Sequence, residues 1–515
     1  MAHAPVPMRV NPQVEPLSSN KAATLARTLQ WTLLAGCILR LWLLPLPSSF
    51  WVDELVTEFV VHHPGHPSFA MAPQVPASIY YRLPAVSESW FGLSEISYRL
   101  PSVLCMGLAL LIIARLASRL IHPNAAWFAA FACLGLRGIN YFAADARPYA
   151  MGICVSAASL FFLVRWLDSA WWLDALLFAA FAALLWPIHL VYWPFYSIYA
   201  LYIGLRLWRH ETKVSMGQAI AVLILVFAAL VPEAVKAYAL LREAGSHVVA
   251  AVPGIREFEH AARWNLAFIC GTAAWILARV FGWKANRARS SSTSLILILA
   301  WWLSQPVFIF LFSHITGNSI FVERYLSIAL PGAALTATAV AAMWIPADCW
   351  RGASLVLGAG VFLIMGQWST SNPRHGNSDW RAAAQDERRL AYSEDTPVVC
   401  LSPFIEARSP KWSPDYPLPG FLYAHLPGYP VTGKPYLLPF GDYAADGEPY
   451  AARLTRDVLS HSNRFLIYGA NRHWRAWFHR RPELTGWVST LKQFGDVQLV
   501  VFDNPGTPPR AAMKR

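Results

Sequence analysis

The chain of 515 residues is 56% hydrophobic and only 14% charged, with a formal net charge of +12. An ordinary soluble protein contains about 25% charged residues, so these values exclude a soluble enzyme, an intrinsically disordered chain and a disulfide-rich secreted scaffold. The apolar residues fall into separate runs near the roughly 20-residue length that crosses a bilayer. The composition therefore predicts an all-α polytopic membrane bundle.

The first part of the chain divides into a tail and a membrane domain. Residues 1–26 are polar and Pro-rich without apolar periodicity, which predicts a disordered cytoplasmic tail. Residues 27–368 form the predicted transmembrane domain, with eleven apolar segments. The predicted spans are residues 27–46, 100–121, 125–143, 148–166, 171–187, 188–206, 217–235, 264–282, 293–312, 324–345 and 352–368.

Basic residues gather at alternate ends of these spans. They include Lys21, Arg27, Arg115, Arg119, Arg165, Arg206, Arg209, Lys213, Lys284, Arg287 and Arg289. By the positive-inside rule these ends are cytoplasmic, so the N-terminus is predicted in the cytoplasm and the C-terminus outside. The positive charge thus marks topology and gives no reason to expect a nucleic-acid partner.

Two longer stretches lie outside the membrane in this topology. The first external loop, residues 47–99, carries an acidic motif near its start. Residues 369–515 have ordinary charge with frequent Pro and Gly, and they predict a small extracytoplasmic α/β domain. Its predicted strands are residues 398–401, 465–468 and 497–502, and its predicted helices are residues 380–392, 451–460 and 472–480.

The acidic motif is the pair Asp53 and Glu54, which follows directly after Pro45 and Pro47 end the first span. Adjacent carboxylates at a membrane surface could accept a proton from a hydroxyl, hold a metal ion, or cap the following helix. These residues alone leave the three interpretations open.

A second group lies around the turn between the third and fourth spans. Pro148 suits the first turn of the outgoing helix, with Asp145 as its cap. Asp145 and Arg147 could be functional or could form a structural ion pair. Arg137 lies inside the third span, where a cation needs an anion or a water-filled cavity.

A third group opens the tenth span. Arg324 could bind a phosphate through its planar guanidinium, or it could anchor the helix at the interface together with Tyr325. His189, between the fifth and sixth spans, could be a metal ligand or could hydrogen-bond a carbonyl. The histidines of residues 62–66 are interrupted by Pro and Gly, which favours a solvated loop over a metal site.

The order of these motifs resembles a known superfamily. The acidic pair is followed by Ser-Tyr-Arg-Leu-Pro-Ser at residues 97–102, Ala-Arg-Pro-Tyr at 146–149, and Glu-Arg-Tyr-Leu at 323–326 with Leu-Pro at 330–331. Together they resemble the GT-C integral-membrane glycosyltransferases, in particular bacterial relatives of protein O-mannosyltransferases and of the lipid A aminoarabinose transferase. Asp-Trp-Arg at 379–381 is similar to the start of the soluble domain in many of these enzymes.

The resemblance implies transfer of a sugar from a polyprenyl-phosphate donor to an acceptor hydroxyl at the outer face of a bacterial plasma membrane, with inversion. The acceptor would be a glycolipid, a polysaccharide or a protein. By likeness, Asp53 would be the general base, Glu54 would support it or help hold a divalent metal ion, and Asp145 would lie in the same cavity. The candidate phosphate ligands are Arg99, Arg137, Arg147 and Arg324, and the metal candidates are Glu54 and His189.

Three alternatives stay open at this stage. A ligase or polymerase using a polyprenyl-diphosphate carrier should have its large outer loop late in the bundle, whereas here that loop follows the first span. A transporter or flippase should show paired charges near mid-membrane and repeated halves, whereas here the charges gather at helix ends. An inactive relative that scaffolds an envelope complex is the third.

Overall fold

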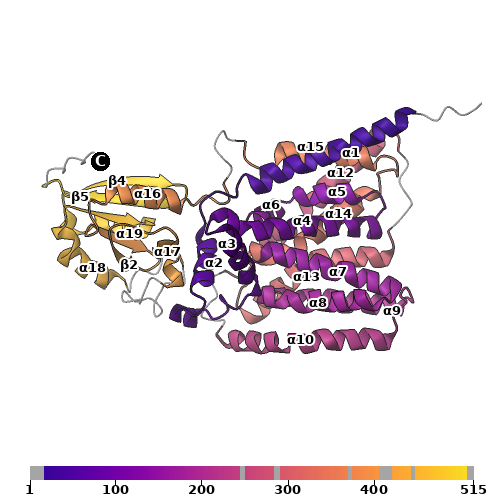
Figure 1. The fold of residues 1–515 in the computed structure, drawn as a ribbon, viewed down its shortest axis with the longest axis horizontal. Coiled ribbons are helices and arrows are strands. Elements are labelled where there is room, and N and C mark those ends of the chain that lie inside the picture. The colour runs from indigo at the N-terminus through magenta and orange to yellow at the C-terminus, as the bar shows by residue number, and fades with distance from the viewer. Residues whose placement is uncertain are drawn as a thin grey trace, which may run out of the picture.

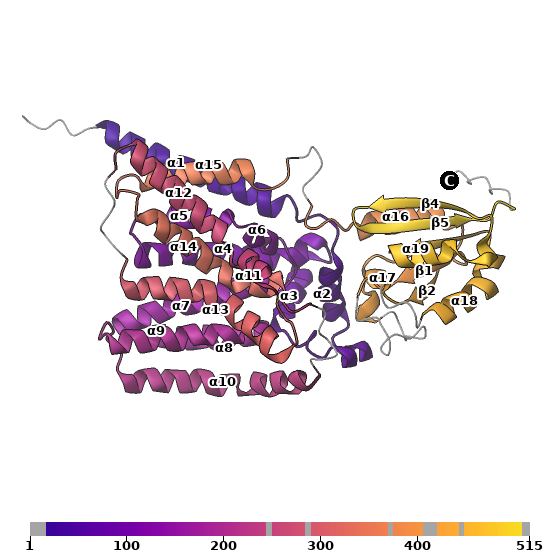
Figure 2. The same cartoon turned by 180° about the vertical axis from the view of Figure 1, so that it is seen from behind.

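A computed structural model describes residues 17–243, 250–283, 290–368, 374–404, 420–441 and 447–506. A bundle of helices carries a small α/β domain at one end, and the first helix begins at the opposite end (Figure 1; seen from behind in Figure 2). That helix, α1, runs over Leu17–Ile38. The structure therefore corrects the predicted tail of residues 1–26, of which 1–16 lie outside the described residues, because Ala, Leu, Lys and Arg favour helix and extend the span toward its N-terminus.

Helices occupy all of the predicted apolar spans. Among the described residues, five segments are long and apolar enough to cross a membrane, or six if α11 (Ile255–Ala262) and α12 (Trp264–Val280), bent by 52°, form one span. The chain is therefore a multi-pass membrane protein, while the number of eleven spans and their orientation stay predictions. The other bundle helices are η1 (Leu39–Leu43), α4 (Glu95–Leu120), α5 (Ala126–Leu134), α6 (Arg137–Ala143), α7 (Tyr149–Ser169), α8 (Trp172–Ile188), η4 (Leu190–Phe195), α9 (Tyr196–Trp208), α10 (Met216–Glu243), α13 (Ser292–Thr316), η6 (Glu323–Ala329), α14 (Leu330–Ala342) and α15 (Trp350–Ile364).

Small residues let the central helices approach closely. A Cβ atom at Gly332 on α14 would lie 2.3 Å from the backbone nitrogen of Trp302 on α13, so only glycine fits there. At the periphery, α10 exposes large apolar side chains such as Phe227 and Val235, as a helix facing lipid does. Hydropathy thus separates a tightly packed centre from a lipid-facing rim.

The first external loop forms short helices between the bundle and the α/β domain. These are α2 (Val52–His62), η2 (Pro67–Met71), η3 (Ile79–Tyr81) and α3 (Arg82–Phe91). At the start of α2 the backbone N–H of Trp51 donates to Oε2 of Glu54 over 3.2 Å, a bond that satisfies a donor at the helix N-terminus. The acidic motif therefore lies in the first turn of a helix at the outer end of the bundle.

The α/β domain contains a five-stranded sheet with the order β2-β1-β3-β5-β4. Strand β1 pairs in parallel with β2 and β3, whereas β5 pairs antiparallel with β3 and β4. Helices α18 and α19 cover one face, and α16 and η7 contribute to the core on the other. The bounds are β1 Pro397–Leu401, β2 Lys434–Leu438, β3 Arg464–Tyr468, β4 Val488–Phe494, β5 Val497–Asp503, α16 Trp380–Leu390, η7 Phe421–Tyr423, α17 His425–Gly428, α18 Glu448–Asp457, η9 Leu459–His461, α19 Arg472–His479 and η10 Pro482–Leu484.

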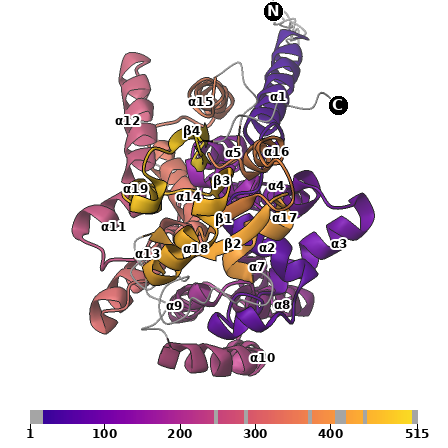
Figure 3. The ribbon, with the colours of Figure 1, turned by 90° about the vertical axis from the view of Figure 1, so that its left-hand side faces the viewer.

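This domain packs directly on the external loop. One hydrophobic core continues from Leu55 and Phe59 of α2 to Tyr423 and Leu426 of the α/β domain. Seen from the side of the α/β domain, the sheet lies in front of the centre of the bundle end, whereas α3, α10 and α12 extend beyond it (Figure 3). The α/β domain therefore lies over the end of the bundle that carries the acidic motif.

Candidate active site

Two arginines from distant parts of the bundle contact Asp53. Its Oδ2 atom lies 3.4 Å from Nη1 of Arg324, in η6. Nη1 of Arg147, in the turn between α6 and α7, donates to the backbone oxygen of Asp53 over 3.1 Å. The structure therefore brings together Asp53, Arg147 and Arg324.

Several polar atoms around Asp53 have no hydrogen-bond partner among the described residues, although they are buried. They are Oδ2 of Asp53, Nε of Arg147, Nε of Arg324 and the hydroxyl of Tyr149. A buried donor without a partner costs about 1–3 kcal/mol. The donors are the Nε atoms of the two arginines and the hydroxyl of Tyr149. An anionic ligand with several oxygen atoms could accept hydrogen bonds from all three.

Glu54 points away from this cluster and forms a fully buried ion pair with Arg99. Nε of Arg99 donates to Oε1 of Glu54 over 2.7 Å, and Nη2 contacts Oε2. Arg99 also donates to the backbone oxygens of Leu46 and Ser48, over 2.7 and 2.6 Å, and to that of Ser49 over 3.1 Å. The structure therefore does not place Arg99 with the candidate phosphate ligands, because protein oxygens engage its donors.

The charge of Glu54 is set by these neighbours. Burial by itself would raise the pKa of Glu54, but the charges of Arg99 and His375 and the hydrogen bonds from Arg99 and from the Ala146 backbone hold it below its ordinary value. The Ala146 backbone N–H donates to Oε1 over 2.8 Å. Glu54 thus ties the start of α2 to the turn that carries Asp145 and Arg147.

Asp145 is buried beside a histidine that the motif analysis did not identify. Its Oδ1 atom accepts a hydrogen bond from Nε1 of Trp51 over 3.0 Å and lies 3.3 Å from Nε2 of His375. Burial raises the pKa of Asp145, while the hydrogen bond and charge of His375 oppose the rise. His375 follows the last apolar segment within an ordinary polar stretch, so no sequence signal distinguished it.

The structure also tests the predicted metal ligands. Within the described ranges, the group of three residues able to hold a metal ion is Glu54, Asp145 and His375, with ligand atoms within 4.8 Å of one another. Both oxygens of Glu54 already accept from Arg99, and this guanidinium would repel a divalent cation. The donor set therefore does not fit a divalent metal, although its spacing would allow one.

His189 and Arg137 lie outside both groups of carboxylates. Nδ1 of His189 accepts from the Val191 backbone over 3.4 Å, and its ring lies 5.0 Å from that of Tyr325. His189 is therefore not part of the three-residue group that contains Glu54. Arg137 is the exposed first residue of α6, and in the part of the chain that the structure describes it has no hydrogen bond or ion pair.

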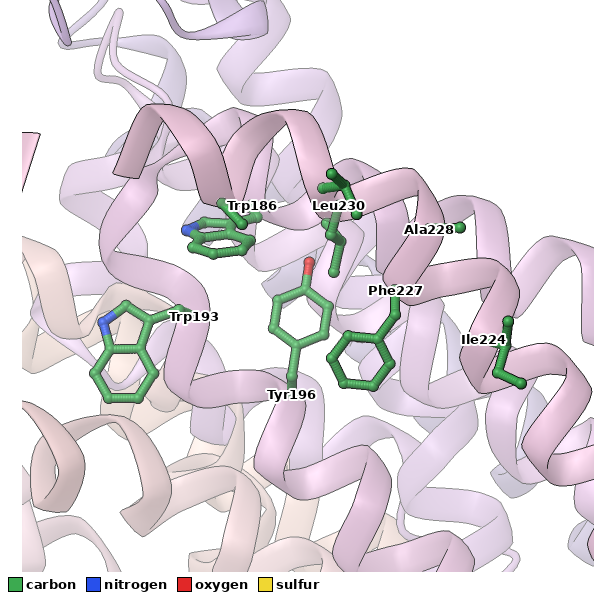
Figure 4. Close-up of a pocket in the computed structure, with 9 residues that line it drawn as sticks. Trp186, Trp193, Tyr196, Ile224, Phe227, Ala228 and Leu230 are labelled. Atoms are coloured by element: carbon green, nitrogen blue, oxygen red, sulfur yellow. The ribbon is translucent and has the colours of Figure 1, made fainter. Parts of the chain in front are cut away.

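An apolar cavity of about 660 Å³ lies on the lipid-facing side of the bundle, between α8, η4, α9 and α10 (Figure 4). Its walls carry aromatic and aliphatic side chains, including Trp186, Trp193, Tyr196, Phe227 and Leu230. It contains none of the charged residues described above. The cavity is apolar and its lining does not include the residues of the polar site at Asp53.

Comparisons with known proteins agree with the resemblance drawn from the motifs. Residues 82–232 match the family model of dolichyl-phosphate-mannose-protein mannosyltransferases. The fold is similar to the crystal structure of ArnT from Cupriavidus metallidurans in the apo state, with a TM-score of 0.53 and 12% identity over 94% of this chain and 98% of ArnT. The ArnT structure bound to undecaprenyl phosphate gives a TM-score of 0.51 at 12% identity with the same coverage.

No curated protein sequence matches the chain. The predicted resemblance to GT-C membrane glycosyltransferases is confirmed by the family model and by the shared fold. At 12% identity, the likeness to ArnT establishes the fold alone.

Proposed function

We propose that this protein is a membrane glycosyltransferase that moves a sugar from a polyprenyl-phosphate-linked donor to an acceptor hydroxyl, with Asp53 as the general base. The observation that carries the proposal is the convergence of Arg147 and Arg324 on Asp53, with a donor on each arginine that has no partner among the described residues. ArnT, which has a similar fold, binds undecaprenyl phosphate, and this supports a lipid-linked phosphate as the donor.

The two arginines account for the leaving group. As the bond between the anomeric carbon and the phosphate oxygen breaks, the electron pair leaves with the phosphate and its negative charge grows. Nε of Arg147, Nε of Arg324 and the hydroxyl of Tyr149 have no partner in the ranges that the structure describes, so they can donate to its oxygens. Fixed cations and donors of this kind stabilise the transition state more than the ground state.

Asp53 accounts for the acceptor. Its Oδ2 atom has no hydrogen-bond partner in the described part of the chain and can accept the proton of the acceptor hydroxyl as the new carbon–oxygen bond forms. Attack opposite the departing phosphate inverts the anomeric carbon. The proton then passes from Asp53 to solvent, which restores the base.

The remaining carboxylates have supporting roles in this proposal. Glu54, paired with Arg99, holds the first turn of α2, and Asp145 fixes Trp51, two residues before Asp53. Oδ2 of Asp145 also lacks a hydrogen-bond partner among the described residues, but Asp53 is the carboxylate that lies in ion-pair contact with Arg324. Glu54 and Asp145 act through position rather than by contact with the sugar.

The position of the site in the bundle supports an outer-face reaction. Helix α2, whose first turn contains Asp53, lies at the bundle end that carries the α/β domain, opposite the start of α1 (Figure 1). Arg119 and Arg206, predicted as cytoplasmic topology signals, share Asp168 as an ion-pair partner, at 2.5 and 2.6 Å. We therefore assign the site to the outer face of a bacterial plasma membrane, where a glycolipid, polysaccharide or protein would be the acceptor.

The test is sugar transfer by the purified full-length protein with a polyprenyl-phosphate sugar donor. Asp53→Asn should lower the rate by about 10²- to 10⁴-fold, the usual contribution of a general base. Asp395→Asn, the same change at an exposed carboxylate of the α/β domain, is the matched control and should leave the rate unchanged. Full activity of Asp53→Asn would refute the assignment of the base.

The products distinguish the alternative functions. Transfer from a polyprenyl-phosphate donor releases polyprenyl phosphate, whereas a ligase of the alternative kind would release polyprenyl diphosphate. Movement of intact lipid-linked sugar across a vesicle membrane, without cleavage, would identify a transporter instead.

A further inference from the structure

Residues 46–51 link the first span to α2 and so determine where Asp53 lies. On the bundle side, Arg99 binds the backbone oxygens of Leu46, Ser48 and Ser49. This chain segment has no regular helix or strand of its own between η1 and α2. Its path therefore depends on the side chains that bind it.

The α/β domain and the segment leading into it bind the same residues from the other side. The backbone N–H of His375 donates to Oγ of Ser48 over 3.0 Å. Arg381, on α16, donates from its backbone to Oγ of Ser49 over 3.3 Å and from Nη2 to the backbone oxygen of Pro47 over 3.1 Å. The linking segment is thus held between Arg99 and the C-terminal domain.

Tyr429 adds the contact nearest to Asp53. Its hydroxyl accepts a hydrogen bond from the Phe50 backbone N–H over 2.8 Å and donates to Oε1 of Glu95 over 2.6 Å. Nε of Arg381 donates to the same carboxylate oxygen over 3.1 Å. Glu95 is the first residue of α4, the helix that also carries Arg99. The same helix therefore supports the contacts of Arg99 and those of Arg381 and Tyr429.

We infer that the C-terminal α/β domain positions the catalytic carboxylate, and that Arg381 and Tyr429 are the positioning residues. The inference rests on the proposed role of Asp53 and extends it to a part of the chain outside the membrane bundle. Apolar packing between α2 and Leu426 attaches the domain, whereas the polar contacts to Pro47, Ser49 and Phe50 set the path of the segment before α2.

The hydroxyl of Tyr429 permits a test that removes one atom. Tyr429→Phe keeps the ring, which packs against the shared core, but it deprives the Phe50 N–H of its acceptor. We expect kcat for sugar transfer to fall about tenfold with the KM for the donor unchanged, since small displacements of a catalytic group cost up to about 10²-fold. Backbone amides of residues 46–57 should exchange hydrogen faster than in the unmodified protein.

Arg381 provides the second variant and its rescue. Arg381→Met should lower kcat about tenfold, and Arg381→Lys should recover part of the loss because it restores a cation beside Glu95. Arg388→Met is the matched control, because Arg388 is exposed on the same helix and has no hydrogen bond or ion pair within the described residues. It should change neither kcat nor amide exchange.

The outcomes separate this inference from the proposed function. Unchanged kcat in Tyr429→Phe and Arg381→Met would overturn the inference, as would a fall in kcat with unaltered exchange at residues 46–57. A rise in KM alone would also overturn it, because that result assigns the contacts to donor binding. If the unmodified protein transfers no sugar, the proposed function fails. Faster amide hydrogen exchange at residues 46–57 in Tyr429→Phe would still show that the α/β domain holds this segment.

Discussion

Nε2 of His375 lies 3.3 Å from Oδ1 of Asp145, across 230 positions of the sequence. Asp145 belongs to the turn between α6 and α7, and His375 belongs to the segment that leads into the α/β domain. The same Oδ1 atom accepts from Nε1 of Trp51 over 3.0 Å. The buried carboxylate of Asp145 therefore joins three parts of the chain: the bundle, the start of α2 and the segment that leads into the α/β domain. It lies two residues before Arg147 in the sequence.

The first prediction separates donor binding from folding. Arg324→Met should lower kcat/KM for the donor by about 10- to 100-fold, which corresponds to the roughly 1.5–3 kcal/mol of a hydrogen bond to a charged group. The unfolding temperature should change little, because Arg324 is partly exposed and its Nε has no partner in the described residues. Steady-state kinetics and a thermal unfolding curve measure both effects, and an unchanged kcat/KM would argue against a phosphate role.

The second prediction concerns the buried ion pair. Arg99→Met leaves the carboxylate of Glu54 without its cation at a site with no solvent exposure. Breaking such a pair costs about 3–5 kcal/mol, so the variant should unfold at a markedly lower temperature and lose activity at every donor concentration. A stable Arg99→Met protein whose only defect is a raised KM for the donor would contradict this prediction. It would indicate that Arg99 binds the donor phosphate.

The third prediction follows from the raised pKa of Asp145. Burial raises the pKa of folded Asp145 above the value of about 3.9 in the unfolded chain. The contribution of Asp145 to folding stability is therefore fully present below about pH 3.9. It is lost as the pH rises through the pKa of the folded state. Asp145→Asn does not titrate. The stability of Asp145→Asn relative to the unmodified protein should therefore increase between pH 4 and the pH at which Asp145 is ionised, as thermal unfolding at a series of pH values would show.

A relative stability of Asp145→Asn that falls with rising pH would contradict this sign. Asp386→Asn is the control, because Asp386 pairs with Lys492 on the α/β domain, away from the site. Its stability relative to the unmodified protein should not follow the same course.

The fourth prediction concerns metal ions. Because Arg99 engages both oxygens of Glu54, exhaustive treatment with a chelator should leave sugar transfer and the unfolding temperature unchanged. Elemental analysis of the purified protein should find less than one divalent ion per chain. Loss of activity on chelation, restored by a divalent ion and abolished in His375→Ala, would instead make Glu54, Asp145 and His375 a metal site.

Part of the α/β domain was predictable and part was not. Strands β1, β3 and β5 are apolar runs, and their predicted positions agree with the structure to within a residue. Strands β2 and β4 were missed because they lie at the two edges of the sheet. Edge strands carry exposed residues such as Lys434 and Thr490, so their sequence lacks the continuous apolar run of a buried strand.

The sequence by itself determined the helical segments of the bundle, the α/β domain and the positions of Asp53, Arg147 and Arg324 at helix ends. Hydropathy and helix termini are local properties of the chain, so they can be read without knowledge of distant contacts. Only the tertiary structure decided that Arg99 neutralises Glu54, that His375 reaches Asp145, and that Arg381 and Tyr429 hold the segment before α2. Each of these contacts joins residues far apart in the chain, and in a buried site it is the partner of a charged group that determines what the group can do.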